Sequence, residues 1–133
     1  MQMQENKTNA LDVQVGGNHY KKQLIQPIEL AYILNASPCF TKLAKYLSRE
    51  KGNREQDLEK AKHVISLEES LSCFDVKYGG IEKGVTLYWI KKFSSNSDIQ
   101  NALYTMYIQD YTSAIFYVES FTAGYKNTDI QEA

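Results

Sequence analysis

The sequence contains few of the residues and segments that mark secreted or membrane-bound proteins. Only two cysteines, Cys39 and Cys73, occur among 133 residues, which is too few for a disulfide framework and fits a reducing cytosol. No apolar run approaches the roughly 20 residues that a membrane-spanning helix needs, and the polar start predicts no secretory signal. With 43% hydrophobic and 23% charged residues, the chain is predicted to be one cytoplasmic domain with no membrane contact.

Several motifs of catalysis and metal binding are also absent from the sequence. The glycines and the lysine between Gly79 and Thr86 occur in the wrong order for a phosphate-binding loop. No Gly-x-Ser-x-Gly elbow of a hydrolase occurs. The two cysteines and two histidines lack the spacing of zinc ligands, so we predict no metal centre built from protein side chains.

The formal net charge of −1 conceals an uneven distribution of charge. Residues 21–62 contain nine basic and five acidic residues, whereas residues 63–133 contain five basic and nine acidic residues. The basic part favours an anionic ligand, and the acidic part favours basic partners or a second subunit. An ordinary solvated surface explains the same pattern equally well. Ten tyrosines are present, most of them after Tyr78, and tyrosine is enriched at protein interfaces.

Apolar periodicity and helix-start signals predict an all-α domain. A first helix begins at Pro27 and ends near residues 35–37, and Ser37-Pro38 begins a second helix that runs to about residue 51. After a turn at Gly52, Asn53 is expected to cap a third helix that ends near residue 72. The predicted buried stripe of the second helix repeats at helical spacing and consists of Phe40, Leu43, Ala44 and Leu47.

The second half of the chain is less regular. Residues 73–93 are predicted to form a short hairpin or a helix, because periodicity does not assign short apolar runs. A long helix is predicted from about residue 98 to 122, with Gly124 as its stop. Its apolar side chains occupy more than one face, which is typical of a helix that is central to the domain or shared with another subunit. We therefore also predict a homo-oligomer.

The predicted organisation has four parts. Residues 1–15 form a flexible N-terminal segment, and residues 125–133 form a tail. Between them, residues 16–72 and the tyrosine-rich residues 73–124 belong to the same helical domain.

A group of basic side chains defines a candidate phosphate site. Lys42, Lys45 and Arg49 are spaced to lie on the helix face opposite the buried stripe, Lys51 follows before the turn, and Lys60 can point back from the next helix. The N-terminus of that next helix also favours an anion. The alternative is a solvated helix face, which is what charge runs more often are. If the site exists, we expect Arg49→Ala to weaken phosphate binding and to change folding little.

Other polar side chains have more than one interpretation. His19 and Tyr20 follow a glycine turn and are suited to stacking on a base, or to proton exchange by the histidine; alternatively, they pack the start of the chain onto the helices. Glu29 and Asp57 are candidate metal ligands or bases, although Asp57 also suits the first turns of a helix.

A series of short motifs runs through residues 16–69: His19-Tyr20, Gln26-Pro27-Ile28-Glu29, Phe40, Lys45-Tyr46-Leu47-x-Arg49, Lys51-Gly52 and Asp57-Leu58-x-Lys60-Ala61. In order and spacing these motifs resemble the SaV-like, or nucleotide kinase-like, family of small bacteriophage proteins. The sequence departs from the family pattern at Lys42-Leu43 and at His63-Val64.

The resemblance implies a phage protein that binds or phosphorylates deoxynucleoside monophosphates in the cytoplasm of an infected bacterium, without the usual phosphate loop. It implies roles in holding phosphate for Lys45, Arg49, Lys51 and Lys60. It implies contacts with the base or sugar for His19 and Tyr20, and magnesium that arrives with the nucleotide. The competing hypothesis is a non-catalytic phage protein that uses the acidic, tyrosine-rich second half to bind and inhibit a host protein of defence or nucleic-acid processing.

Overall fold

The computed structural model describes residues 25–50 and 52–132, and within them it is all-helical, which confirms the predicted fold class. The α-helices are α2 (Pro27–Leu34), α3 (Pro38–Ser48), α4 (Arg54–Leu71), α5 (Lys83–Phe93), α6 (Ser97–Tyr107) and α7 (Tyr111–Glu132). A short 3-10 turn, η2 (Ser72–Phe74), follows α4. No helix in these residues is both long enough and apolar enough to cross a membrane.

The three predicted N-terminal helices are present and begin at the predicted residues. Ser37 caps α3 by accepting a hydrogen bond from the Phe40 amide at 3.1 Å, and Asn53 caps α4 by accepting one from the Gln56 amide at 3.0 Å. Helix α2 ends at Asn35, which adopts a left-handed conformation with φ of 52°. Short-range capping chemistry therefore sets these helix starts.

Helix α3 ends earlier than predicted. It stops at Ser48, and Arg49 has the extended backbone of a C-cap, with φ of −72° and ψ of 127°. The predicted helix to residue 51, and with it the i, i+7 spacing of Lys42 and Arg49 on one helical face, is therefore wrong. The physical reason is that the Arg54 guanidinium donates hydrogen bonds to the carbonyls of Tyr46 and Leu47. These carbonyls therefore need no amide from a further helical turn.

The predicted single helix over residues 98–122 is two helices, α6 and α7. Gln109 between them has φ of 66°, which interrupts the helical backbone. Asp110 then starts α7 by accepting hydrogen bonds from the Ser113 amide at 3.2 Å and hydroxyl at 2.7 Å. Gly124 is not a stop, because α7 continues to Glu132. In residues 73–93 the helix alternative is correct for α5, and no hairpin forms.

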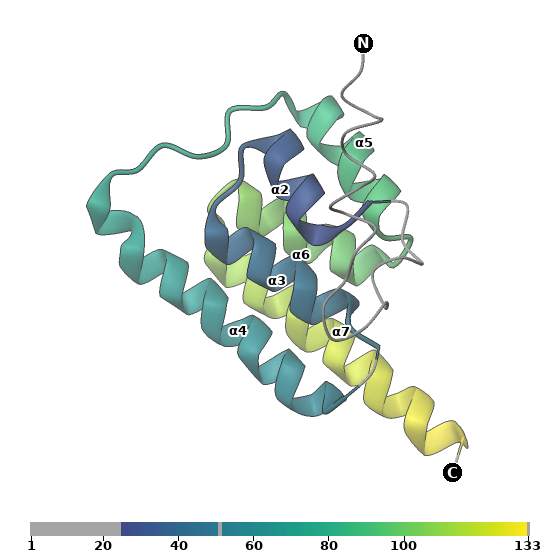
Figure 1. The fold of residues 1–133 in the computed structure, drawn as a ribbon. Coiled ribbons are helices and arrows are strands. Elements are labelled where there is room, and N and C mark those ends of the chain that lie inside the picture. The colour runs from purple at the N-terminus through teal and green to yellow at the C-terminus, as the bar shows by residue number, and fades with distance from the viewer. Residues whose placement is uncertain (1–24, 51, 133) are drawn as a thin grey trace.

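Helix α3 lies near the middle of the fold (Figure 1). Helix α3 contacts α2, α4 and α6, and α7 packs against both α4 and α6. An extended segment of residues 75–82, which we call the strap, crosses from the end of η2 to α5. The predicted α3 stripe is buried completely or nearly so. The core formed with it includes Leu34, Leu58, Ile65, Leu103 and Val118.

Candidate functional site

Two features of the described residues have the chemistry of a binding site. One is the predicted basic region, which lies where α3 ends and α4 begins; we call it the α3–α4 corner. The other is a pocket between the start of α3, the end of α4 and the strap, which was not predicted.

Arg49 lies at the α3–α4 corner in an ion pair within the fold. Its Nη1 atom lies 3.4 Å from Oδ1 of Asp57 in the first turns of α4. The Asp57 side chain is 5% exposed and that of Arg49 is 31% exposed. Asp57 Oδ2 and Arg49 Nε are buried and have no hydrogen-bond partner among the described residues. The contact is therefore a single hydrogen bond between a buried carboxylate and a partly exposed guanidinium, and Arg49 has a structural role that the sequence did not reveal.

Arg54, which the sequence interpretation did not single out, has the second structural role at this corner. It donates to the carbonyls of Tyr46 at 2.8 Å, Leu47 at 2.7 Å and Arg49. Its guanidinium also lies 5.0 Å from the centre of the Phe121 ring on α7. Burial lowers the pKa of Arg54, and the Asp57 carboxylate opposes that shift. An arginine directly after a helix N-cap and a short connection was the available signal for this capping role.

Lys45 and Lys60 both lie near the ring of Tyr46. The Lys45 ammonium lies 5.2 Å from the ring centre, and the Lys60 ammonium, which comes from α4, lies 5.9 Å from it. Neither lysine forms an ion pair within residues 25–50 and 52–132. Two cations from neighbouring helices are thus held at one aromatic ring with no described carboxylate to neutralise them.

The remaining predicted site residues, His19, Tyr20 and Lys51, lie outside the described residues. Of the two candidate carboxylates, Asp57 is engaged by Arg49. Glu29 accepts a hydrogen bond from the Gln26 amide at 3.1 Å at the start of α2. Within the described part of the chain, no three His, Cys, Asp or Glu side chains lie close enough together to hold a metal ion.

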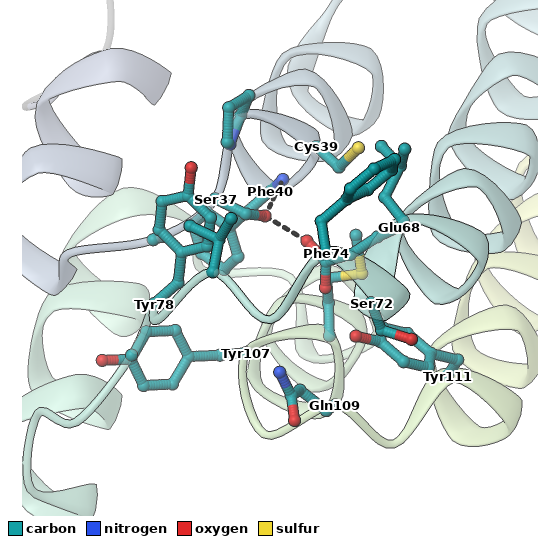
Figure 2. A pocket seen from close by; sticks show the side chains of 16 residues that line it. Ser37, Cys39, Phe40, Glu68, Ser72, Phe74, Tyr78, Tyr107, Gln109 and Tyr111 are labelled. Carbon is teal, nitrogen blue, oxygen red and sulfur yellow. Dashed lines mark hydrogen bonds between the residues drawn. The ribbon is translucent and has the colours of Figure 1, made fainter.

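The pocket has a volume of about 300 Å³. Its apolar walls come from α3, α6, η2 and the strap and include Phe40, Phe74, Val76, Tyr78 and Met106. Figure 2 shows Phe74, Tyr78, Tyr107 and Tyr111 around the pocket. Dashed lines mark the hydrogen bonds from the Ser37 hydroxyl to Glu68 and from the Phe40 amide to Ser37.

The strap that forms one wall is fixed at its far end. The Gly79 amide donates to the Asn35 carbonyl at 2.7 Å. The Tyr107 hydroxyl donates to the Leu34 carbonyl at 2.7 Å and accepts from the Ile81 amide at 3.0 Å. Gly79 has φ of 84°, a conformation that favours glycine. Closer to η2, the side chains of the strap are exposed, so the pocket opens to solvent beside them.

The polar side of the pocket is dominated by Glu68. Among the described residues that line the pocket, it is the only charged one, and it accepts a hydrogen bond from the Ser37 hydroxyl. The Tyr111 hydroxyl is buried and has no partner of standard geometry within the described residues. Burial, then the negative charge of Glu68 and then a side-chain interaction with that carboxylate, raise the pKa of Tyr111. Burial and then the charge of Glu68 also raise the pKa of the buried Cys39 thiol.

The pocket residues gave no signal in the sequence, because they come from four separate segments. Ser37 was recognised only as a helix cap, and Glu68 and Tyr111 lie 43 positions apart, with the strap between them in the sequence.

Comparison with protein-family models, with curated proteins and with solved structures finds no match to this chain.

Proposed function

We propose that the protein binds deoxynucleoside monophosphates, with the phosphate at the α3–α4 corner, in the cytoplasm of a phage-infected bacterium. The observation that carries the proposal is the pair of ammonium groups, from Lys45 and Lys60, at 5.2 and 5.9 Å from one tyrosine ring. Neither ammonium has a carboxylate partner within the described residues, so both are available to an anion. The nucleotide character of that anion is what the sequence resemblance implies.

Arg49 contributes to this proposed site by its position rather than by a free guanidinium. Its ion pair with Asp57 connects the end of α3 to the first turns of α4, and those two elements carry Lys45 and Lys60. Arg49 thereby helps to hold together the two elements that carry the lysines. The dipole at the N-terminus of α4 also favours an anion.

Phosphoryl transfer is the further step that the resemblance implies. In such a reaction, a nucleotide donor passes its terminal phosphoryl group to an oxygen of the monophosphate, giving a nucleoside diphosphate. The lysines would hold the acceptor phosphate and neutralise its charge. Magnesium bound with the donor would neutralise the charge on the transferred group.

Calorimetric titration with the four common deoxynucleoside monophosphates tests the binding proposal. A hydrogen bond to a charged group contributes about 1.5–3 kcal/mol, so Lys45→Gln and Lys60→Gln should each weaken binding about tenfold or more. Lys92→Gln is the matched control, because Lys92 makes the same kind of contact, 5.5 Å from the Tyr88 ring, on α5. Equal losses in the control and the corner variants would contradict the proposal. Incubation with ATP and magnesium, followed by separation of the products, tests transfer separately.

Recognition of a host protein is the second candidate function, and exposed apolar side chains in the second half of the chain favour it. Phe74 is 70% exposed and Phe116 is 62% exposed, and larger exposed apolar patches mark protein–protein interaction sites. If this surface binds a partner, Phe74→Ser and Phe116→Ser should abolish capture of that partner without changing nucleotide affinity. Lys45→Gln and Lys60→Gln should weaken nucleotide binding and leave capture of that partner unchanged.

A further inference from the structure

The pocket beneath the strap is chemically different from the α3–α4 corner. It combines aromatic and aliphatic walls with one carboxylate, that of Glu68, and no lysine, arginine or histidine lines it among the described residues. A nucleotide phosphate would meet only negative charge there. A cation would be attracted, so the pocket and the corner favour ligands of opposite sign.

The polar atoms of the pocket still have hydrogen-bonding capacity. A carboxylate has about four acceptor sites, and the hydrogen bond from the Ser37 hydroxyl occupies one of those on Glu68. The Tyr111 hydroxyl is buried and interacts with the Glu68 carboxylate, but without a hydrogen bond of standard geometry in the described part of the chain. A buried hydroxyl without a well-formed hydrogen bond is unfavourable, so a ligand with a polar group at this point would gain from pairing with it.

We propose that this pocket binds a small organic cation: a primary amine with an aromatic or aliphatic body. The ammonium group donates hydrogen bonds to Glu68 and lies beside the aromatic rings of Phe74 and Tyr111, whose faces attract cations. The apolar body lies against Val76, Tyr78 and Met106. The volume of about 300 Å³ is at the small end of ligand pockets, which span about 300–1,000 Å³, so the amine is small.

Three probes of similar shape and different charge test the proposal: phenethylamine, 2-phenylethanol and 3-phenylpropionate. Titration at pH 7 into isotope-labelled protein, followed by NMR, measures each affinity and shows which residues respond. The amine should bind at least about tenfold more tightly than the alcohol or the acid. The main difference is the charged hydrogen bond from its ammonium group to Glu68. Pocket residues such as Val76 and Met106 should show the largest shifts.

Glu68→Gln should remove the preference for the amine, because it removes the negative charge and keeps an acceptor for Ser37. Glu69→Gln is the matched control, since Glu69 is the next residue of α4, is exposed and does not line the pocket. The proposal is overturned if the acid or the alcohol binds as tightly as the amine. It is also overturned if Glu68→Gln keeps the preference, or if the amine produces no shifts in the pocket.

A second measurement leaves Glu68 unchanged, so the proposal can be tested even if the Glu68→Gln variant does not fold. Cys39 is buried and lines the pocket, whereas Cys73 is exposed. In the Cys73→Ser variant, phenethylamine at about ten times its dissociation constant should slow alkylation of Cys39 about tenfold, by simple occupancy of the site. Phenylpropionate at the same concentration should not. Equal alkylation rates with and without the amine would contradict binding in this pocket.

Discussion

Removing Arg49 should destabilise the protein, because it leaves the Asp57 carboxylate buried without its partner. The Asp57 side chain is 5% exposed, and its contact with Arg49 spans 3.4 Å. Breaking a buried pair by removing one partner costs about 3–5 kcal/mol. The 31% exposure of Arg49 admits water and places the cost of Arg49→Ala below that range, at about 2–3 kcal/mol.

The opposite substitution, Asp57→Ala, should cost less. The guanidinium that it leaves behind is partly exposed and regains contact with water, so we expect about 1–2 kcal/mol. In the double variant neither charge remains unpaired. The sum of the two single losses in unfolding free energy should therefore exceed the loss in the double variant by about 1 kcal/mol or more.

Urea denaturation of the four proteins at pH 7 measures these free energies of unfolding. A shift of the midpoint at constant slope reports a change in stability alone. Arg54→Ala is a useful comparison, because it removes a cap of α3 without leaving a buried carboxylate unpaired. If Arg49→Ala costs less than about 0.5 kcal/mol, the typical effect of a surface substitution, the ion pair is not structural. Arg49 would then be available to a ligand directly.

Three further predictions concern the pocket and the assembly. Because the pKa of Tyr111 is raised above its ordinary value of 10.0, its contribution to stability is complete below about pH 10 and is lost as the pH rises further; Tyr111→Phe should make the alkaline decline in urea midpoint shallower, and an unchanged decline would contradict the shift. Alkylation at neutral pH should modify the exposed Cys73 much faster than the buried Cys39, whose thiol pKa is raised. Mass spectrometry of the labelled peptides measures both rates, and equal rates would contradict this prediction. Self-association remains predicted from the exposed apolar side chains of the second half, such as Phe116, and sedimentation showing only the 15.3 kDa monomer at tens of micromolar would refute it.

Local signals in the sequence were sufficient for the N-terminal helices. Pro27 and the Ser37-Pro38 pair act within one helical turn of themselves, so the starts of α2 and α3 could be predicted from neighbouring residues alone. The buried stripe of α3 followed from helical spacing, since one face of that helix is the core face.

Features that depend on contacts across the chain could not be predicted in the same way. The end of α3 is set by Arg54 from the next helix, and the break before α7 has neither glycine nor proline at residues 108–110 to mark it. The role of Arg49 depends on how deeply Asp57 is buried, which no local pattern encodes. The pocket exists because the strap crosses the start of α3 and the end of α4, and its residues share no motif.

The most direct test of nucleotide binding at the α3–α4 corner compares a deoxynucleoside with its own monophosphate by calorimetry. With the unmodified protein, the monophosphate should bind at least about tenfold more tightly, since each charged hydrogen bond to phosphate contributes about 1.5–3 kcal/mol. In the Lys45→Gln, Lys60→Gln double variant, this preference for the phosphate should disappear, whereas Lys92→Gln should retain it. A monophosphate that binds no better than its nucleoside, or a preference that survives the loss of both lysines, would contradict the proposed site.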